Sequence, residues 1–79
     1  MTISAKIKSL LKMQNAEHAG LAEHLGISKQ ALSNKFFRDS FSGSDLIKVA
    51  DYLKCKLCFI SGESQVSLEP SDLKSTEES

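Results

Sequence analysis

Proline is nearly missing from this chain, because Pro70 is the single one among 79 residues and none precedes it to break a helix. Tryptophan is absent, and the two cysteines, Cys55 and Cys58, are too few for a disulfide scaffold, which fits a reducing compartment. No apolar run approaches the roughly 20 residues that cross a bilayer, and the N-terminus lacks a signal-peptide core. We therefore expect a cytoplasmic protein with no membrane segment.

The chain also lacks the patterns that carry enzymatic chemistry. It has no glycine-rich phosphate loop, and nothing in it places a nucleophile beside a base. His18 and His24 lie six residues apart and do not share a helix face, and a lone C-x-x-C at Cys55 and Cys58 has no second ligand pair. We expect no enzyme, no cofactor, no metal and no small-molecule substrate, with redox use of the thiols as the minor alternative.

Charge is balanced in total but unevenly placed. Lysine and arginine together number 10, as do aspartate and glutamate. The chain up to Cys58 carries a net charge of +4, and the remainder carries −4. A basic body with an acidic tail can present a positive face to phosphate, although overall neutrality weakens that expectation.

Hydrophobic periodicity divides the chain into four helices and a hairpin. Apolar residues recur at helical spacing in residues 2–14, 16–25, 29–38 and 43–54. Residues 55–69 then alternate around a Ser-Gly-Glu-Ser turn, which predicts a β-hairpin. We expect one domain over residues 1–69 and an acidic, disordered tail over residues 70–79.

Helix boundaries are marked by capping residues. Gly26 stands where a helix end needs a left-handed residue, and Ser42 and Asp45 match a capping box. Gly20, inside the second helix, suggests close contact with another helix. The predicted N-caps are Thr2 or Ser4, Asn15, Ser28 and Ser42. We assign the phenylalanines at 36, 37 and 41 to the core rather than to base-stacking platforms.

Residues 21–35 read as a helix, a glycine turn and a second helix with a polar face, the layout of a helix-turn-helix DNA reader. Residues 3–58 resemble the phage repressor/Cro type of this motif, the XRE-like or lambda-repressor-like family. The match rests on Leu21-Ala22, Leu25-Gly26-Ile27-Ser28, Leu32-Ser33 and the later run Leu46–Leu53. The expected fold is all-α, a lambda-repressor-like four-helix bundle with a short C-terminal β-hairpin.

The resemblance implies sequence-specific binding of double-stranded DNA by a small transcriptional regulator, with a dimeric repressor as the expected form. Base edges would be contacted from the start of the third helix by Ser28, Lys29, Gln30, Ser33 and Asn34. Phosphates would be held by His18, Lys35, Arg38 and Ser42.

The chain departs from the family pattern at three places. Glu17-His18 replaces the usual Thr-Gln, Lys35–Arg38 replaces the usual end of the third helix, and strand-like residues 55–60 replace a fifth helix. A protein-interaction module that has lost DNA binding is therefore the alternative function. From the alternating pattern we expect a homodimer contact through the hairpin, at Leu57, Phe59, Val66 and Leu68.

Overall fold

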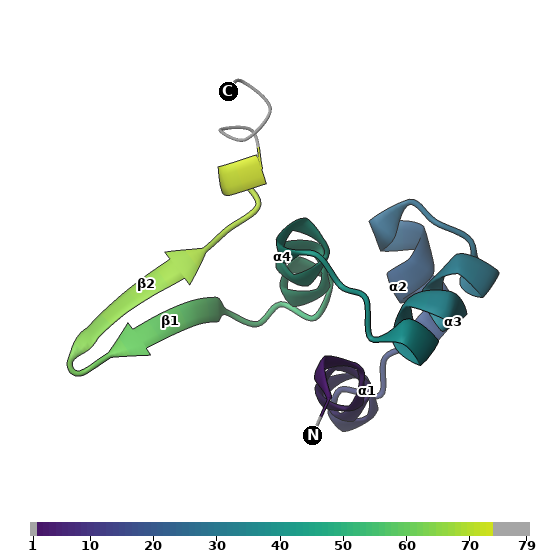
Figure 1. Ribbon diagram of the computed structural model, residues 1–79, viewed down its shortest axis with the longest axis horizontal. Helices are drawn as coiled ribbons and strands as arrows, with labels where there is room; N and C mark the ends of the chain where they lie inside the picture. The colour runs from purple at the N-terminus through teal and green to yellow at the C-terminus, as the bar shows by residue number, and fades with distance from the viewer. Residues whose placement is uncertain (1, 74–79) are drawn as a thin grey trace.

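The computed structural model describes residues 2–73, which form four helices followed by a two-stranded antiparallel sheet (Figure 1). The elements are α1 (Ile3–Met13), α2 (His18–Leu25), α3 (Lys29–Arg38), α4 (Gly43–Tyr52), β1 (Leu57–Ser61) and β2 (Ser64–Leu68). The predicted four helices and hairpin are present. The class all-α is too narrow, however, because the hairpin is a paired sheet with a regular register.

Side-chain caps begin three of the helices. The hydroxyl oxygens of Thr2, Ser28 and Ser42 each accept a hydrogen bond from the backbone N–H three residues later, at 3.0–3.1 Å. The Asp45 carboxylate in turn accepts from the Ser42 N–H at 3.0 Å, which completes the predicted capping box. These local signals were sufficient to predict where α1, α3 and α4 begin.

The start of α2 was predicted wrongly. Asn15 does not cap it, because Asn15 has a positive φ of 54° and ends the preceding helix instead. The Ala16 N–H donates to the Leu11 carbonyl at 2.8 Å, the bond that closes a Schellman motif. Consequently α2 begins at His18, after Glu17, whose side chain makes no cap hydrogen bond.

The same motif ends each of the helices α1 to α4. A left-handed residue follows each one, and the next N–H donates to the carbonyl five residues back, at 2.8–3.0 Å. The left-handed residues are Asn15, Gly26, Asp39 and Lys54. The turn between α2 and α3 is therefore short, and it fixes the direction in which α3 leaves α2.

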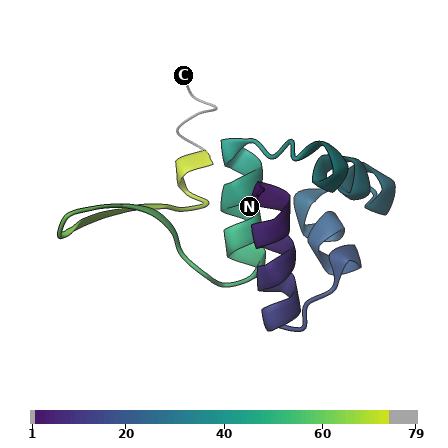
Figure 2. The ribbon, with the colours of Figure 1, turned by 60° about the horizontal axis from the view of Figure 1, so that its bottom comes forward.

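The core lies among the four helices. Leu11, Leu21, Leu32 and Leu53, one from each of α1 to α3 and one from the end of α4, are almost fully buried. Helix α2 packs against both α3 and α4, and α1 packs against α3 (Figure 2). Among the apolar residues of α1, Ile7 and Leu11 are buried, whereas Met13 is 79% exposed.

Gly20 is a point of close contact between α2 and α4. The hydroxyl of Tyr52 lies where a side chain at position 20 would begin, and it donates to the Glu17 carbonyl at 3.3 Å. The predicted close helix contact at this glycine is confirmed.

The hairpin extends away from the helices in both ribbon views (Figures 1 and 2). Leu57 pairs with Leu68 and Phe59 with Val66, so all four predicted contact residues lie on one face of the sheet. Gly62, with a φ of 61°, makes the tight turn. After β2, residues 70–71 form a turn and residues 72–73 are helical, with the Asp72 carboxylate accepting from the Glu69 N–H at 2.7 Å, so the predicted disorder does not hold for residues 70–73. The rest of the predicted tail, residues 74–79, lies outside the described residues.

Candidate nucleic-acid interface

The predicted base-reading residues gather on one outward surface of α3. Ser28, Lys29, Gln30, Ser33 and Asn34 are all exposed. Ser28 also caps the helix, since its Oγ accepts from the Ala31 N–H at 3.0 Å, which leaves its hydroxyl proton available to donate. The start of α3 thus presents hydroxyl, ammonium and amide groups to the solvent side.

Two amides on this surface are brought together. The Gln30 Nε2 donates to the Asn34 Oδ1 at 3.5 Å, one helical turn away. A bond this long is weak, so both side chains stay free to exchange it for a ligand. Amide side chains present a donor and an acceptor, the pair that matches the major-groove edge of adenine.

Phe36 fixes α3 from its buried side. This residue is 7% exposed, and its ring lies 5.3 Å from the Phe41 ring and 5.3 Å from the His18 imidazole. The Lys8 ammonium lies 5.1 Å from the Phe36 ring centre, within cation–π range. Phe36 therefore joins α1, the start of α2 and the loop after α3 beneath the polar surface.

The four predicted phosphate-binding residues are placed differently from one another. His18 and Arg38 are exposed, at the first turn of α2 and the last turn of α3. Ser42 is exposed too, and it caps α4. Lys35 is half-buried, and its ammonium donates to the Asp45 carboxylate at 2.9 Å, so its charge serves first to join α3 to α4.

Asp45 holds this joint as an ionised group. Burial raises its pKa, but the Lys35 ammonium and the Ser42 N–H and hydroxyl outweigh that effect, and the net pKa is lowered. The Asp45 carboxylate is therefore negatively charged while it completes the cap of α4 and pairs with Lys35.

Three of the five acids of the body make internal contacts. Asp39 accepts from the Ser4 N–H, Asp45 pairs with Lys35, and the Asp51 carboxylate lies 2.9 Å from the His24 imidazole. Lys8, Lys29 and Arg38 are exposed around α3, and the other two acids, Glu17 and Glu23, are exposed at the start of α2 and along it. The residues up to Cys58 carry a net charge of +4, so this surface belongs to the basic part of the chain.

Two residues of this region were missed from the sequence. Phe37 was assigned to the core, but it is 91% exposed, whereas Phe41 is partly buried as expected. Phe37 follows Gln30 by seven residues and Ser33 by four, a spacing that places all three on one helix face. The helical period was therefore the signal that should have placed Phe37 outside.

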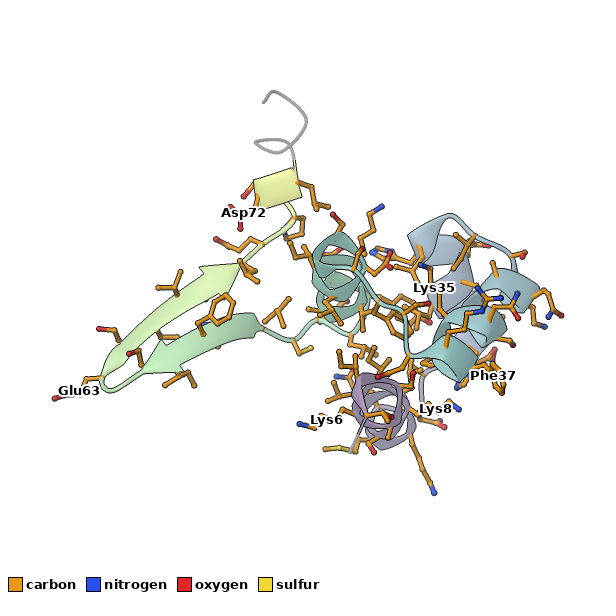
Figure 3. The ribbon with its side chains drawn as sticks, viewed as in Figure 1. Lys6, Lys8, Lys35, Phe37, Glu63 and Asp72 are labelled. Atoms are coloured by element: carbon orange, nitrogen blue, oxygen red, sulfur yellow. The ribbon has the colours of Figure 1, made fainter. Side chains whose placement is uncertain are left out.

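The second residue, Lys8, had no predicted role. It lines an open hollow of about 300 Å³ with His18, Ser33, Phe36 and Phe37. Figure 3 shows Lys8 and Phe37 where α1 and α3 meet. No sequence spacing relates these residues, because the hollow forms only when α1 crosses α3.

Other chemistry finds little support in the part of the chain that the structure describes. Residues 2–73 contain no group of three or more histidine, cysteine or acidic side chains able to hold a metal ion. Cys55 is exposed and Cys58 half-buried, both as free thiols. No helix among these residues is long and apolar enough to span a membrane.

The family model of the bacteriophage CI repressor helix-turn-helix domain matches residues 5–68. The chain belongs to this family. The match includes both strands of the hairpin as well as all but the first residues of the helical body. No curated protein and no solved structure matches the chain.

Membership of the CI repressor helix-turn-helix family assigns the chain to the DNA-binding regulators, a class that is typically non-enzymatic. Within this fold α2 and α3 are the two helices of the motif, and α3 is the one with the polar outward surface.

Proposed function

We propose that this chain binds double-stranded DNA sequence-specifically as a small transcriptional repressor. The supporting observation is the surface of α3, where Ser28, Lys29, Gln30, Ser33 and Asn34 are exposed together. In this proposal α3 lies in the major groove, and its amides and Lys29 contact base edges. His18, Arg38 and Ser42 hold phosphates on either side.

Lys35 has a divided role in this proposal. Its ion pair with Asp45 orients α3 relative to α4, and a phosphate approaching the same ammonium adds a second anion to it. We therefore expect Lys35 to contribute less to DNA affinity than Arg38, whose guanidinium is exposed.

The active form in this proposal is a homodimer, because one helix-turn-helix contacts only a few base pairs. The hairpin offers a self-complementary surface. Phe59 is 69% exposed and Val66 62% exposed, side by side across the strands, and a two-stranded hairpin is marginal alone in water. The face of these two residues continues through Leu57 and Leu68.

A groove extends this surface toward the helices. It has a volume of about 320 Å³, and Ile47, Ala50, Leu57 and Leu68 are among its lining residues. Both bases and acids stand around it, Lys54 and Lys56 with Asp51 and Glu69. In a dimer with a two-fold axis between the two hairpin faces, the lysines around the groove of one copy would face the acids of the other copy.

A protein-interaction module remains the second candidate, and Glu17 is the observation that favours it. An exposed carboxylate at the N-cap of α2 repels a phosphate at a position where helix N–H groups would otherwise attract one.

The two candidates are separated by selection from a random duplex library at near-physiological salt. The wild-type protein is compared with a Gln30→Ala/Asn34→Ala variant and with a Gln14→Ala control, whose substitution lies at the end of α1. Sequence-specific binding predicts one enriched motif for wild type and control, and loss of that motif for the double variant. An interaction module predicts no enrichment by any of the three folded proteins.

A further inference from the structure

An apolar side chain stands alone on the polar reading surface of α3. Phe37 is 91% exposed, although the aromatic residue beside it, Phe36, is 7% exposed and fills the core contact at this end of the helix. A large aromatic side chain left in water contributes nothing to folding through burial. The ring is therefore available to a partner outside the chain.

The direction of Phe37 is set by the helix. Gln30, Ser33, Asn34 and Phe37 recur at the spacing of a single helical stripe. Seven residues of α-helix span about 10.5 Å, and successive bases of one DNA strand are about 3.4 Å apart. The stripe thus covers about three base-pair steps, with amides at its beginning and an aromatic ring at its end.

The surroundings of Phe37 favour a polyanion as the occupant. The hollow beside its ring is lined by Lys8, His18, Ser33 and Phe36, and none of these is acidic. Arg38 follows directly and is exposed. A partner that offers an apolar group close to negative charge matches this arrangement, and in duplex DNA that group is the 5-methyl of thymine in the major groove.

We propose that Phe37 is a specificity residue that contacts the thymine 5-methyl group, with Lys8 beside it facing the adjacent phosphate. This inference rests on the proposed DNA-binding function. It adds the preference for thymine over cytosine at one position of the recognised sequence, which the polar residues of α3 do not account for.

Deoxyuridine provides the sharpest test, because it differs from thymidine only by the methyl group. The most enriched duplex from the wild-type library selection is synthesised again as a series of duplexes. In each of them one thymidine is replaced by deoxyuridine. At one position of each site the wild-type protein should lose about fourfold in affinity, the worth of one buried methyl-sized group. Phe37→Ala should bind the thymidine and deoxyuridine forms of that position equally.

Two controls separate this role from a general effect. Met13→Ala removes another exposed apolar side chain, 79% exposed at the end of α1, and should keep the full deoxyuridine sensitivity. Phe37→Ala should unfold at the same temperature as wild type, because its ring packs outside the core. Retained deoxyuridine sensitivity in Phe37→Ala overturns the proposal.

The remaining outcomes are also decisive. Wild-type protein that enriches a sequence but is indifferent to every replacement contradicts the role of Phe37 and leaves the DNA-binding function standing. If Phe37→Ala changes DNA bending while the wild-type protein shows no sensitivity to the thymine methyl group, Phe37 inserts between bases. That result likewise overturns the proposal. Failure to enrich any duplex removes both proposals together.

Discussion

The carboxylate of Asp39 accepts a hydrogen bond from the backbone N–H of Ser4 at 2.7 Å. Asp39 ends α3 in a left-handed conformation, and Ser4 lies in the first turn of α1. The Ser4 hydroxyl returns the contact by donating to the Phe36 carbonyl at 2.8 Å. The end of the proposed reading helix is thus fastened to the start of the chain's first helix.

Asp39→Asn should lower the thermal midpoint at neutral pH, because it removes the negative charge from this joint. The hydrogen bond from the Ser4 backbone is the main cause that lowers the Asp39 pKa below its ordinary 3.8. A lowered folded-state pKa means that the stabilisation is complete above pH 3.8 and is lost as the pH falls through the lower value. Thermal melts of wild type and Asp39→Asn between neutral and strongly acid pH should therefore converge at the acid end. A constant gap would contradict the assignment.

Gly20→Ala should destabilise the contact between α2 and α4. The added methyl group meets the Tyr52 hydroxyl and ring, which must move and give up the bond to the Glu17 carbonyl. Overpacking costs about 1–3 kcal/mol, and the better helix propensity of alanine returns up to about 1 kcal/mol. We expect a net loss of about 1–2 kcal/mol in urea denaturation. In a Tyr52→Phe background the loss should shrink, and an equal loss there would argue against Tyr52 as the obstacle.

Glu17→Gln should strengthen DNA binding. The substitution removes the exposed negative charge at the N-cap of α2 and keeps a side chain of the same length. A gain of about threefold in affinity is expected at low salt, shrinking as salt screens the repulsion. Glu63→Gln, at the distant hairpin turn seen in Figure 3, is the matched control and should leave affinity unchanged. Equal affinity of wild type and Glu17→Gln would place the DNA elsewhere.

Phe59→Ser should convert the proposed dimer into a monomer. The substitution removes the largest exposed side chain from the apolar face of the hairpin. Sedimentation equilibrium should give twice the chain mass for wild type and the single mass for the variant. Affinity for a two-fold-symmetric duplex should fall about a hundredfold, because the second half-site contact is no longer intramolecular.

Ile60→Ser is the control for that experiment. Ile60 is 72% exposed but points to the opposite face of the sheet, since neighbouring strand residues alternate. The Ile60→Ser variant should remain dimeric. A wild-type protein that stays monomeric at high concentration would refute the hairpin contact.

The parts of this structure that sequence could predict are those with local causes. The caps at Ser28 and Ser42, the left-handed turn at Gly26 and the alternation around Gly62 each depend on a few neighbouring residues. The exposure of the polar residues of α3 also followed from local position. Asn15 shows the limit of such signals, because the same residue type favours both a helix start and a left-handed helix end.

The contacts that depend on tertiary packing could not be predicted. Ser4 and Asp39 are separated by 35 residues, and nothing in their local sequence relates them. The ion pair of Lys35 with Asp45 likewise joins two helices, and it changes the role expected of Lys35. Phe37 differs from these cases, because helical periodicity already placed it with Gln30. Its hydrophobicity was given more weight than its position.

Specific DNA recognition by α3 is tested most directly by the ratio of two affinities. The enriched duplex and a scrambled duplex of the same composition are titrated at about 0.15 M salt with the wild-type protein and with Gln30→Ala/Asn34→Ala. We predict that wild type prefers the enriched duplex by about a thousandfold or more, and that the double variant loses most of that preference while keeping its affinity for the scrambled duplex. A wild-type ratio near one would contradict sequence-specific binding.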